Sequence, residues 1–167
     1  KDDANKEIFL SRMMSQVMKN YGTILYKRGN KKSGSEVRKQ IKKIIKNDGK
    51  SLLLFPEGKS YVGGPPNIFY KGSFEVAFEN NIEIQPITIN YSDKIGWGMK
   101  EKYSKPYNYK LLDNLNYLMD KKHNVKITYH PIVSPKNFIN PESLKIFCHY
   151  VISKEWYKNY KINIINK

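Results

Sequence analysis

The sequence of 167 residues contains few of the residues that build disulfide or metal frameworks: one cysteine, Cys148, and three histidines. A single cysteine excludes an internal disulfide and a cysteine-rich metal site, and it favours a reducing, intracellular compartment. Cys148 lies in the stretch IFCHY of an expected helix, which predicts a buried structural thiol rather than a nucleophile. We therefore expect no bound metal and no bound cofactor.

Long apolar runs and acidic residues are also scarce. No run approaches the roughly 20 residues of a membrane-spanning helix, so no transmembrane segment is predicted. Thirty basic residues against 15 acidic ones give a net charge of +15, which predicts attraction to polyanions, namely nucleic acid, an anionic membrane surface or phosphorylated metabolites. Only Arg12, Arg28 and Arg38 are arginines. Proteins that recognise nucleic-acid bases and phosphates usually do so with arginine. Nucleic acid is therefore the least favoured of these partners.

The hydrophobic fraction of 40% predicts one folded domain over residues 1–167. Apolar periodicity and turn residues place the expected elements along the chain. We expect helices at residues 6–21, about 37–47, 72–80, 110–120 and 141–160, strands at 23–27, 51–55, 82–91 and 125–133, and a polar loop at 28–35. The methionines of the first helix suit either core packing, which we favour, or contact with a lipid interface.

Alternation of helices and strands predicts an α/β fold, with a mainly parallel sheet flanked by helices. The strand at 51–55, SLLLF, is fully apolar and suits the buried middle of such a sheet. Ligands of these folds bind beyond the carboxyl ends of strands. Arg28 and Glu57 each follow an expected strand, so we expect both at that edge.

The sequence Gly58-Lys59-Ser60 after an apolar strand invites comparison with a phosphate-binding loop. That motif needs a glycine five residues before Gly58, because its backbone amides wrap the phosphates. Leu53 stands at that position, and the glycines and prolines of residues 63–66 follow where a helix should begin. The nucleotide-binding interpretation therefore fails.

Five segments in order resemble the glycerolipid acyltransferase superfamily. Phe55–Gly58, FPEG, is similar to the third sequence block of that family, and residues 22–28, GTILYKR, are similar to the second. Residues 69–75, FYKGSFE, and 84–89, IQPITI, resemble the segments that follow, and VKITYHPIVSP resembles the C-terminal strand. The resemblance spans residues 8 to about 158 and implies a glycerol-phosphate acyltransferase-like fold.

The resemblance also implies roles for individual residues. An acceptor phosphate would bind Arg28. The Glu57 side chain would either accept hydrogen bonds from the glycerol hydroxyls or orient the catalytic pair, and the Gly58 amide would lie close to the substrate. Lys59-Ser60-Tyr61 replaces the Thr-Arg-Ser that is usual in the family, which leaves the head-group preference open. The implied substrate-binding residues are Arg28, Glu57, Gly58, Lys59 and Ser60, and the supporting residues are Gly22, Phe55, Pro56, Gly72 and Pro86.

The implied function is transfer of a fatty acyl group to a lysophospholipid or glycerol phosphate, in phospholipid biosynthesis. The donor is acyl-CoA as a cosubstrate, or an acyl carrier protein. The family's first block, His-x4-Asp, supplies the general base, but none of the three histidines has Asp five positions later. We expect that block upstream of Lys1, so that the chain is N-terminally truncated and inactive alone. The alternative is a catalytically inactive protein that binds anionic lipid.

The resemblance and the positive charge together imply a place in the cell. The substrates are lipid precursors, and basic surfaces favour the anionic cytoplasmic leaflet. We therefore expect an intracellular protein that is associated with the cytoplasmic face of a membrane.

Overall fold

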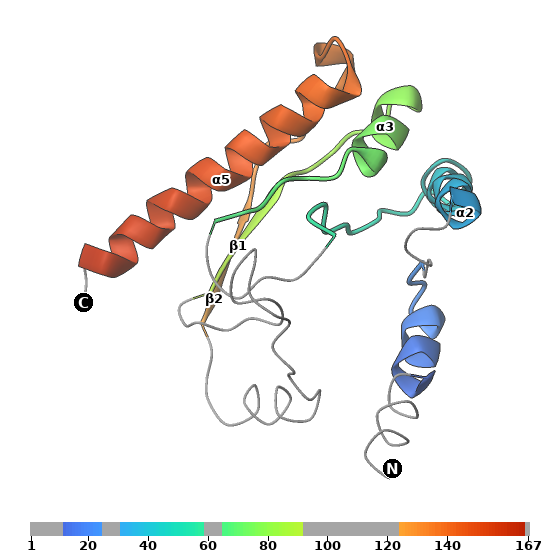
Figure 1. Cartoon of the computed structure of the whole chain (residues 1–167), viewed down its shortest axis with the longest axis horizontal. Helices are drawn as coiled ribbons and strands as arrows, with labels where there is room; N and C mark the ends of the chain where they lie inside the picture. The colour runs from blue at the N-terminus through green and yellow to red at the C-terminus, as the bar shows by residue number, and fades with distance from the viewer. Residues whose placement is uncertain (1–11, 25–30, 59–64, 92–123, 166–167) are drawn as a thin grey trace. The chain divides into compact units, whose positions relative to one another are not determined.

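A computed structural model describes residues 12–24, 31–58, 65–91 and 124–165 of the chain (Figure 1). The chain divides into two compact units, Lys1–Leu52 and Leu53–Lys167. The expected helix at 110–120 lies outside the described residues, as does most of the expected strand at 23–27.

The first unit begins with a helix whose described part covers residues 12–20. Gly22 ends it, with a φ of 80°, a left-handed conformation that favours glycine. The Thr23 amide donates to the Met18 carbonyl and the Gly22 amide donates to the Lys19 carbonyl, each at 2.9 Å. This pair of bonds is the Schellman motif, which satisfies carbonyls at a helix end. The predicted helix is confirmed over its described residues, 12–20, and so is its end at Gly22. The methionines of this helix are 39–47% exposed, so the core packing expected for them is wrong.

Helix α2, Lys31–Lys42, continues into a π-helical turn, η1, Lys43–Asn47. The predicted second helix and its end near Gly49, with a φ of 62°, are confirmed. The predicted loop at 28–35 is wrong from Lys31 onward. Helix α2 begins at Lys31, before the first apolar residue on which the prediction relied.

The predicted buried strand at residues 51–55 is wrong. These residues form no strand, and Leu53 and Phe55 are 67% and 69% exposed. Composition suggested a strand, but a strand also needs a neighbour for its backbone N–H and C=O groups. No described strand pairs with this segment.

The second unit contains the strands β1, Ile87–Tyr91, and β2, Val125–Tyr129. They pair antiparallel, with Thr88 opposite Thr128 and Ile89 opposite Ile127. Pro86 lies directly before β1, where its missing N–H costs no ladder bond. The strands predicted at 82–91 and 125–133 are too long, because residues 82–86 and 130–133 form no strand and contribute only an isolated bridge between Ile84 and Val133.

The described residues do not form the predicted mainly parallel sheet. Their sheet consists of this one antiparallel pair of strands. The alternation of helices and strands did not fix strand direction.

Two helices pack in this unit: α3, Gly72–Glu79, and α5, Pro141–Ile165 (Figure 1). Both were predicted. Asn140 caps α5, because its Oδ1 accepts from the Ser143 amide at 2.9 Å, and Pro141 suits the first helical position. A short 3-10 turn, η2, Pro135–Asn137, precedes it. Helix α5 packs against both α3 and β1.

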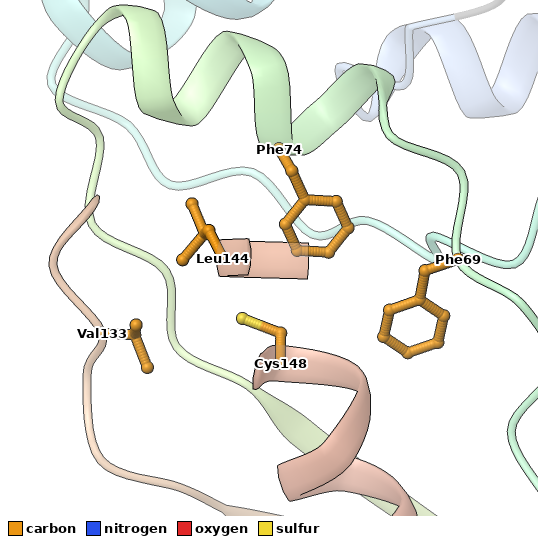
Figure 2. Packing of buried hydrophobic residues seen from close by; sticks show 5 residues of the cluster. All are labelled: Phe69, Phe74, Val133, Leu144 and Cys148. Atoms are coloured by element: carbon orange, nitrogen blue, oxygen red, sulfur yellow. The ribbon is translucent and has the colours of Figure 1, made fainter. Parts of the chain in front are cut away.

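The apolar core of the second unit lies where α3 meets α5 (Figure 2). Leu144 and Cys148 of α5 are 0% and 1% exposed, and Phe74 of α3 is 5% exposed. The rings of Phe69 and Phe74 stack with centroids 6.2 Å apart. Val133, which follows β2, completes the cluster. The core therefore holds in place the segment before α3, through Phe69, and the segments after it, through Ile84 and Val133.

The contact between α5 and β1 is polar. The Thr88 hydroxyl donates to the Ile152 carbonyl at 3.3 Å and lies 2.8 Å from Nε2 of His130. Asn159 of α5 donates to Asn90 Oδ1 at 3.2 Å and accepts from Lys126 Nζ at 2.7 Å. Buried polar groups are stable only when hydrogen-bonded, so these partners fix the position of α5 along the strand.

The core can be tested with two substitutions in α5. Leu144→Ala removes a fully buried side chain and should lower the free energy of unfolding by about 2–5 kcal/mol, measured by urea denaturation. Ile146→Ala in the same helix removes a side chain that is 57% exposed and should change stability by about 0.5 kcal/mol or less. Equal losses in the two variants would contradict the described packing.

Candidate functional site

The candidate site is built around a tight turn at Phe55–Gly58. The Gly58 amide donates to the Phe55 carbonyl at 3.1 Å, which closes a four-residue β-turn. Pro56 occupies the second position, where its fixed φ suits the turn, and Gly58 occupies the fourth with a φ of 63°. The sequence Phe-Pro-Glu-Gly therefore folds locally and leaves Glu57 at the tip.

The Glu57 side chain is held by the backbone of a later loop. Its Oε2 accepts a hydrogen bond from the Asn67 amide at 2.8 Å, in a partly buried setting. No second partner of the Glu57 carboxylate occurs among the described residues. One carboxylate oxygen is thus oriented by the protein, and the other is available to accept a hydrogen bond from a ligand.

A second hydrogen bond ties the same two segments together. The Tyr70 amide donates to the Pro56 carbonyl at 2.8 Å. A Cβ atom on Gly58 would lie 3.0 Å from two ring carbons of Tyr70, closer than ordinary van der Waals contact. Glycine is therefore needed at 58 for its positive φ and for the approach of Tyr70.

The turn is connected to the core through the residues that follow it. Phe69, next to Tyr70, is 5% exposed and packs edge-on against the His149 ring, with centroids 4.8 Å apart. Lys71 forms a 3.0 Å ion pair with Glu75 in α3, and α3 begins at Gly72. The loop that holds Glu57 is therefore anchored at the start of α3.

Comparison with known proteins identifies the family. The family model described as Acyltransferase matches residues 4–90, more than half of the chain. The chain belongs to this acyltransferase family. The match includes the Phe55–Gly58 turn, α3 and most of β1. Together with the curated relative described next, it confirms the resemblance to the glycerolipid acyltransferase superfamily.

A curated relative has a more specific name. The acyltransferase chain is 31% identical over 88 residues to the 1-acyl-sn-glycerol-3-phosphate acyltransferase LPAT1, chloroplastic, of Arabidopsis thaliana. The aligned region is 53% of this chain and 24% of the relative, so the chain spans about a quarter of the length of that relative. No solved structure matches the chain.

The structure brings some of the predicted site residues together. Phe55, Pro56, Glu57 and Gly58 form one turn. Gly72 begins α3 and Pro86 precedes β1, so each occupies a structural position rather than the turn. Gly22 ends a helix in the first unit. Arg28, Lys59 and Ser60 lie outside the described residues, so their roles stay predictions.

Two residues of the site were missed by sequence reasoning, Asn67 and Tyr70. Each contributes its backbone amide. The identity of a side chain in the sequence does not show which backbone amide will donate a hydrogen bond in the site. Asn67 follows two prolines, Pro65 and Pro66, which remove neighbouring N–H donors and restrict the backbone. That local restriction is the signal that could have singled out the Asn67 amide.

The described histidines of the acyltransferase have structural partners. His130 contacts Thr88 and His149 packs on Phe69, while His123 lies outside the described residues. Over the described ranges, no group of three or more His, Cys, Asp or Glu side chains could hold a metal ion. In the same ranges, no helix has the length and apolar character needed to cross a bilayer.

Cys148 is a buried thiol, and burial raises its pKa to about 11. Because the thiolate is the reactive form, the folded chain should resist iodoacetamide at pH 9. A thiol in the unfolded chain has a pKa of about 8.5, so urea should expose a rapidly alkylated cysteine at the same pH. Mass spectrometry of the alkylated protein measures both states, and fast labelling of the folded chain would contradict the burial.

Proposed function

We propose that the protein is an O-acyltransferase of phospholipid biosynthesis, which moves a fatty acyl group from a thioester to glycerol phosphate or a lysophospholipid. Membership of the acyltransferase family supports the reaction type. The name of the relative, a 1-acyl-sn-glycerol-3-phosphate acyltransferase, supports a glycerolipid acceptor. The proposed donor is acyl-CoA or an acyl carrier protein.

The reaction sets three requirements for the protein. The acceptor hydroxyl oxygen attacks the thioester carbonyl, so that a C–O bond forms and the C–S bond breaks. A general base takes the hydroxyl proton, and the departing thiolate receives a proton. The acceptor must also be held in a near-attack geometry, since positioning supplies a large part of such rate enhancements.

The Glu57 geometry is the observation that carries the proposal. One carboxylate oxygen of Glu57 is fixed by the Asn67 amide at 2.8 Å, and the other is available for a hydroxyl donor. A carboxylate hydrogen bond to a glycerol hydroxyl is charge-assisted and directional. We assign Glu57 the orientation of the acceptor, with the Gly58 backbone beside it.

The remaining binding roles follow from residue chemistry. Arg28 would clamp the acceptor phosphate by a bidentate contact. Lys59 would add positive charge in place of the arginine usual in the family, and the Ser60 hydroxyl would add a hydrogen bond. We place the activity inside the cell, at the surface of a membrane, because the acylated product is a lipid.

The catalytic base is assigned to a His-x4-Asp pair outside these 167 residues, since no such spacing occurs within them. That same observation favours the second candidate function, an inactive protein that binds anionic lipid. The two candidates differ in one measurement, consumption of the thioester by a form of the protein that carries residues upstream of Lys1. Acyl transfer to the acceptor supports the enzyme, and lipid binding without turnover supports the inactive binder.

In an active form of the protein, Glu57→Ala and Arg28→Ala should each lower kcat/KM for acyl transfer by roughly 100-fold or more, because misplaced acceptors react poorly. Glu57→Gln keeps an acceptor oxygen for the Asn67 amide and should lose less activity than Glu57→Ala. Glu79→Ala, at an exposed position of α3, is the matched control and should keep normal turnover. Normal turnover in both Glu57→Ala and Arg28→Ala would overturn the site assignment.

A further inference from the structure

The two-stranded sheet of the second unit turns a polar face toward α5, which packs along β1 (Figure 1). Thr88 and Asn90 of β1 are 1% and 8% exposed, and each donates a hydrogen bond to a backbone carbonyl of α5. Lys126 of β2 donates to Asn159 of α5 at 2.7 Å. Lys126 stands opposite Asn90, and opposite residues of an antiparallel pair share a face. The contact with α5 therefore takes up the polar side chains of both strands.

The other face of this sheet is apolar. Side chains alternate between the two faces of a strand, so the residues between the polar ones lie on the side away from α5. Four of them are 46–65% exposed, and the two isoleucines of β1 are half-buried. Antiparallel sheets normally bury an apolar face and leave a polar one in water, and this sheet has the opposite arrangement. The residues are Ile87, Ile89, Tyr91, Val125, Ile127 and Tyr129, and we call them the outer face.

The strand register arranges the outer face as three rows of two residues. Ile89 stands opposite Ile127 in the middle row, Tyr129 stands opposite an isoleucine of β1, and Tyr91 stands opposite a valine of β2. The two tyrosines thus occupy diagonal corners, with a smaller aliphatic residue at each of the other corners. A second copy, related by a two-fold axis parallel to the strands, would place each tyrosine over one of these smaller residues. Large side chains that face small ones can interdigitate.

We propose that the outer face is the contact surface of a homodimer, in which two copies of the chain pack their sheets face to face. Packed sheets lie about 10 Å apart, with side chains of both inner faces between them. The two-fold axis makes the contact isologous, so that one patch serves both copies. Tyrosine suits the edge of such a contact, because its ring is buried while its hydroxyl stays in water.

The area of the outer face sets the strength of this dimer. Two half-exposed tyrosines offer about 100 Å² each, and the four aliphatic residues offer about 50 Å² each, which gives roughly 400 Å² per copy. The total of about 800 Å² is smaller than the roughly 1,200–2,000 Å² of stable complexes. The dimer is therefore weak and reversible, with a Kd of roughly 10–100 µM.

The charge distribution favours a second copy over a charged partner. The outer face contains no Asp, Glu, Lys or Arg, although the chain carries a net charge of +15. A polyanion would therefore find no cation to pair with on this face. Two copies repel each other through their net charge and attract through apolar contact. Salt should thus strengthen the dimer by screening the repulsion, whereas it would weaken the binding of a charged partner.

Sedimentation velocity of the full chain tests the proposal, between about 2 and 500 µM so that the expected Kd is spanned. The face variant is Ile127→Gln with Tyr129→Gln. Its matched control is Ile146→Gln with Tyr150→Gln, which changes the same residue types on α5 at positions that are 57% and 58% exposed. Circular dichroism checks that both variants fold.

The wild-type chain should change from monomer to dimer over this range, and 0.5 M salt should lower the Kd by about twofold or more. The face variant should raise the Kd at least about tenfold, because it places two amides where the dimer buries apolar groups. The control should stay within about threefold of wild type. In nuclear magnetic resonance spectra of the wild-type chain, dilution should shift the amide signals of Ile89 and Ile127 more than that of Ile146.

A monomer at every concentration would overturn the proposal, and it is the result expected if another segment of the chain or a different protein covers the outer face. Equal losses in the face variant and the control would also overturn it, as would dilution shifts that leave β1 and β2 unaffected. Dimerisation is measured without acyl transfer. This proposal and the proposed enzymatic function therefore fail independently.

Discussion

The candidate site depends on the hydrogen bond between the Glu57 carboxylate and the Asn67 amide, 2.8 Å long. It joins residues ten positions apart and fixes the orientation of a side chain at the tip of a turn. A hydrogen bond to an ionised acceptor is roughly twice as strong as a neutral one, and partial burial reduces competition from water. With one oxygen occupied in this way, the carboxylate has a defined direction before any ligand arrives, which lowers the entropic cost of positioning an acceptor.

That orientation is supported from the core outward. The Tyr70 amide binds the Pro56 carbonyl, and the neighbouring Phe69 is buried against Phe74 and His149. Helix α5 contributes Leu144 and Cys148 to the same core and forms hydrogen bonds to Thr88 and Asn90 of β1. The candidate turn is therefore half-buried at Pro56–Gly58, while the residues that position it belong to a packed core. This division suits a site that must admit a substrate without losing its geometry.

Local signals in the sequence predicted local structure well. Apolar periodicity, Gly22 and Pro141 located helices and their ends, whereas the strand predicted from residue 82 begins only after Pro86. The apolar run at 51–55 was interpreted wrongly as a buried strand, because composition does not show whether a pairing partner is present. Strand direction failed for the same reason, since it depends on contacts between distant segments. At the site, the side chain of Glu57 was predicted from its motif, whereas the Asn67 amide that orients it has no signature of its own.

Membership of the acyltransferase family supports the proposed reaction type, and we propose the turn as the place where the acceptor binds. The central claim is that glycerol phosphate binds at Phe55–Gly58 through Glu57. Nuclear magnetic resonance titration of the chain with glycerol 3-phosphate tests it most directly. We expect amide shift changes at Gly58, Asn67 and Tyr70 in the wild-type chain, their loss in Glu57→Ala and their persistence in Glu79→Ala. An unchanged titration in Glu57→Ala, or shift changes that leave these amides unaffected, would contradict the account.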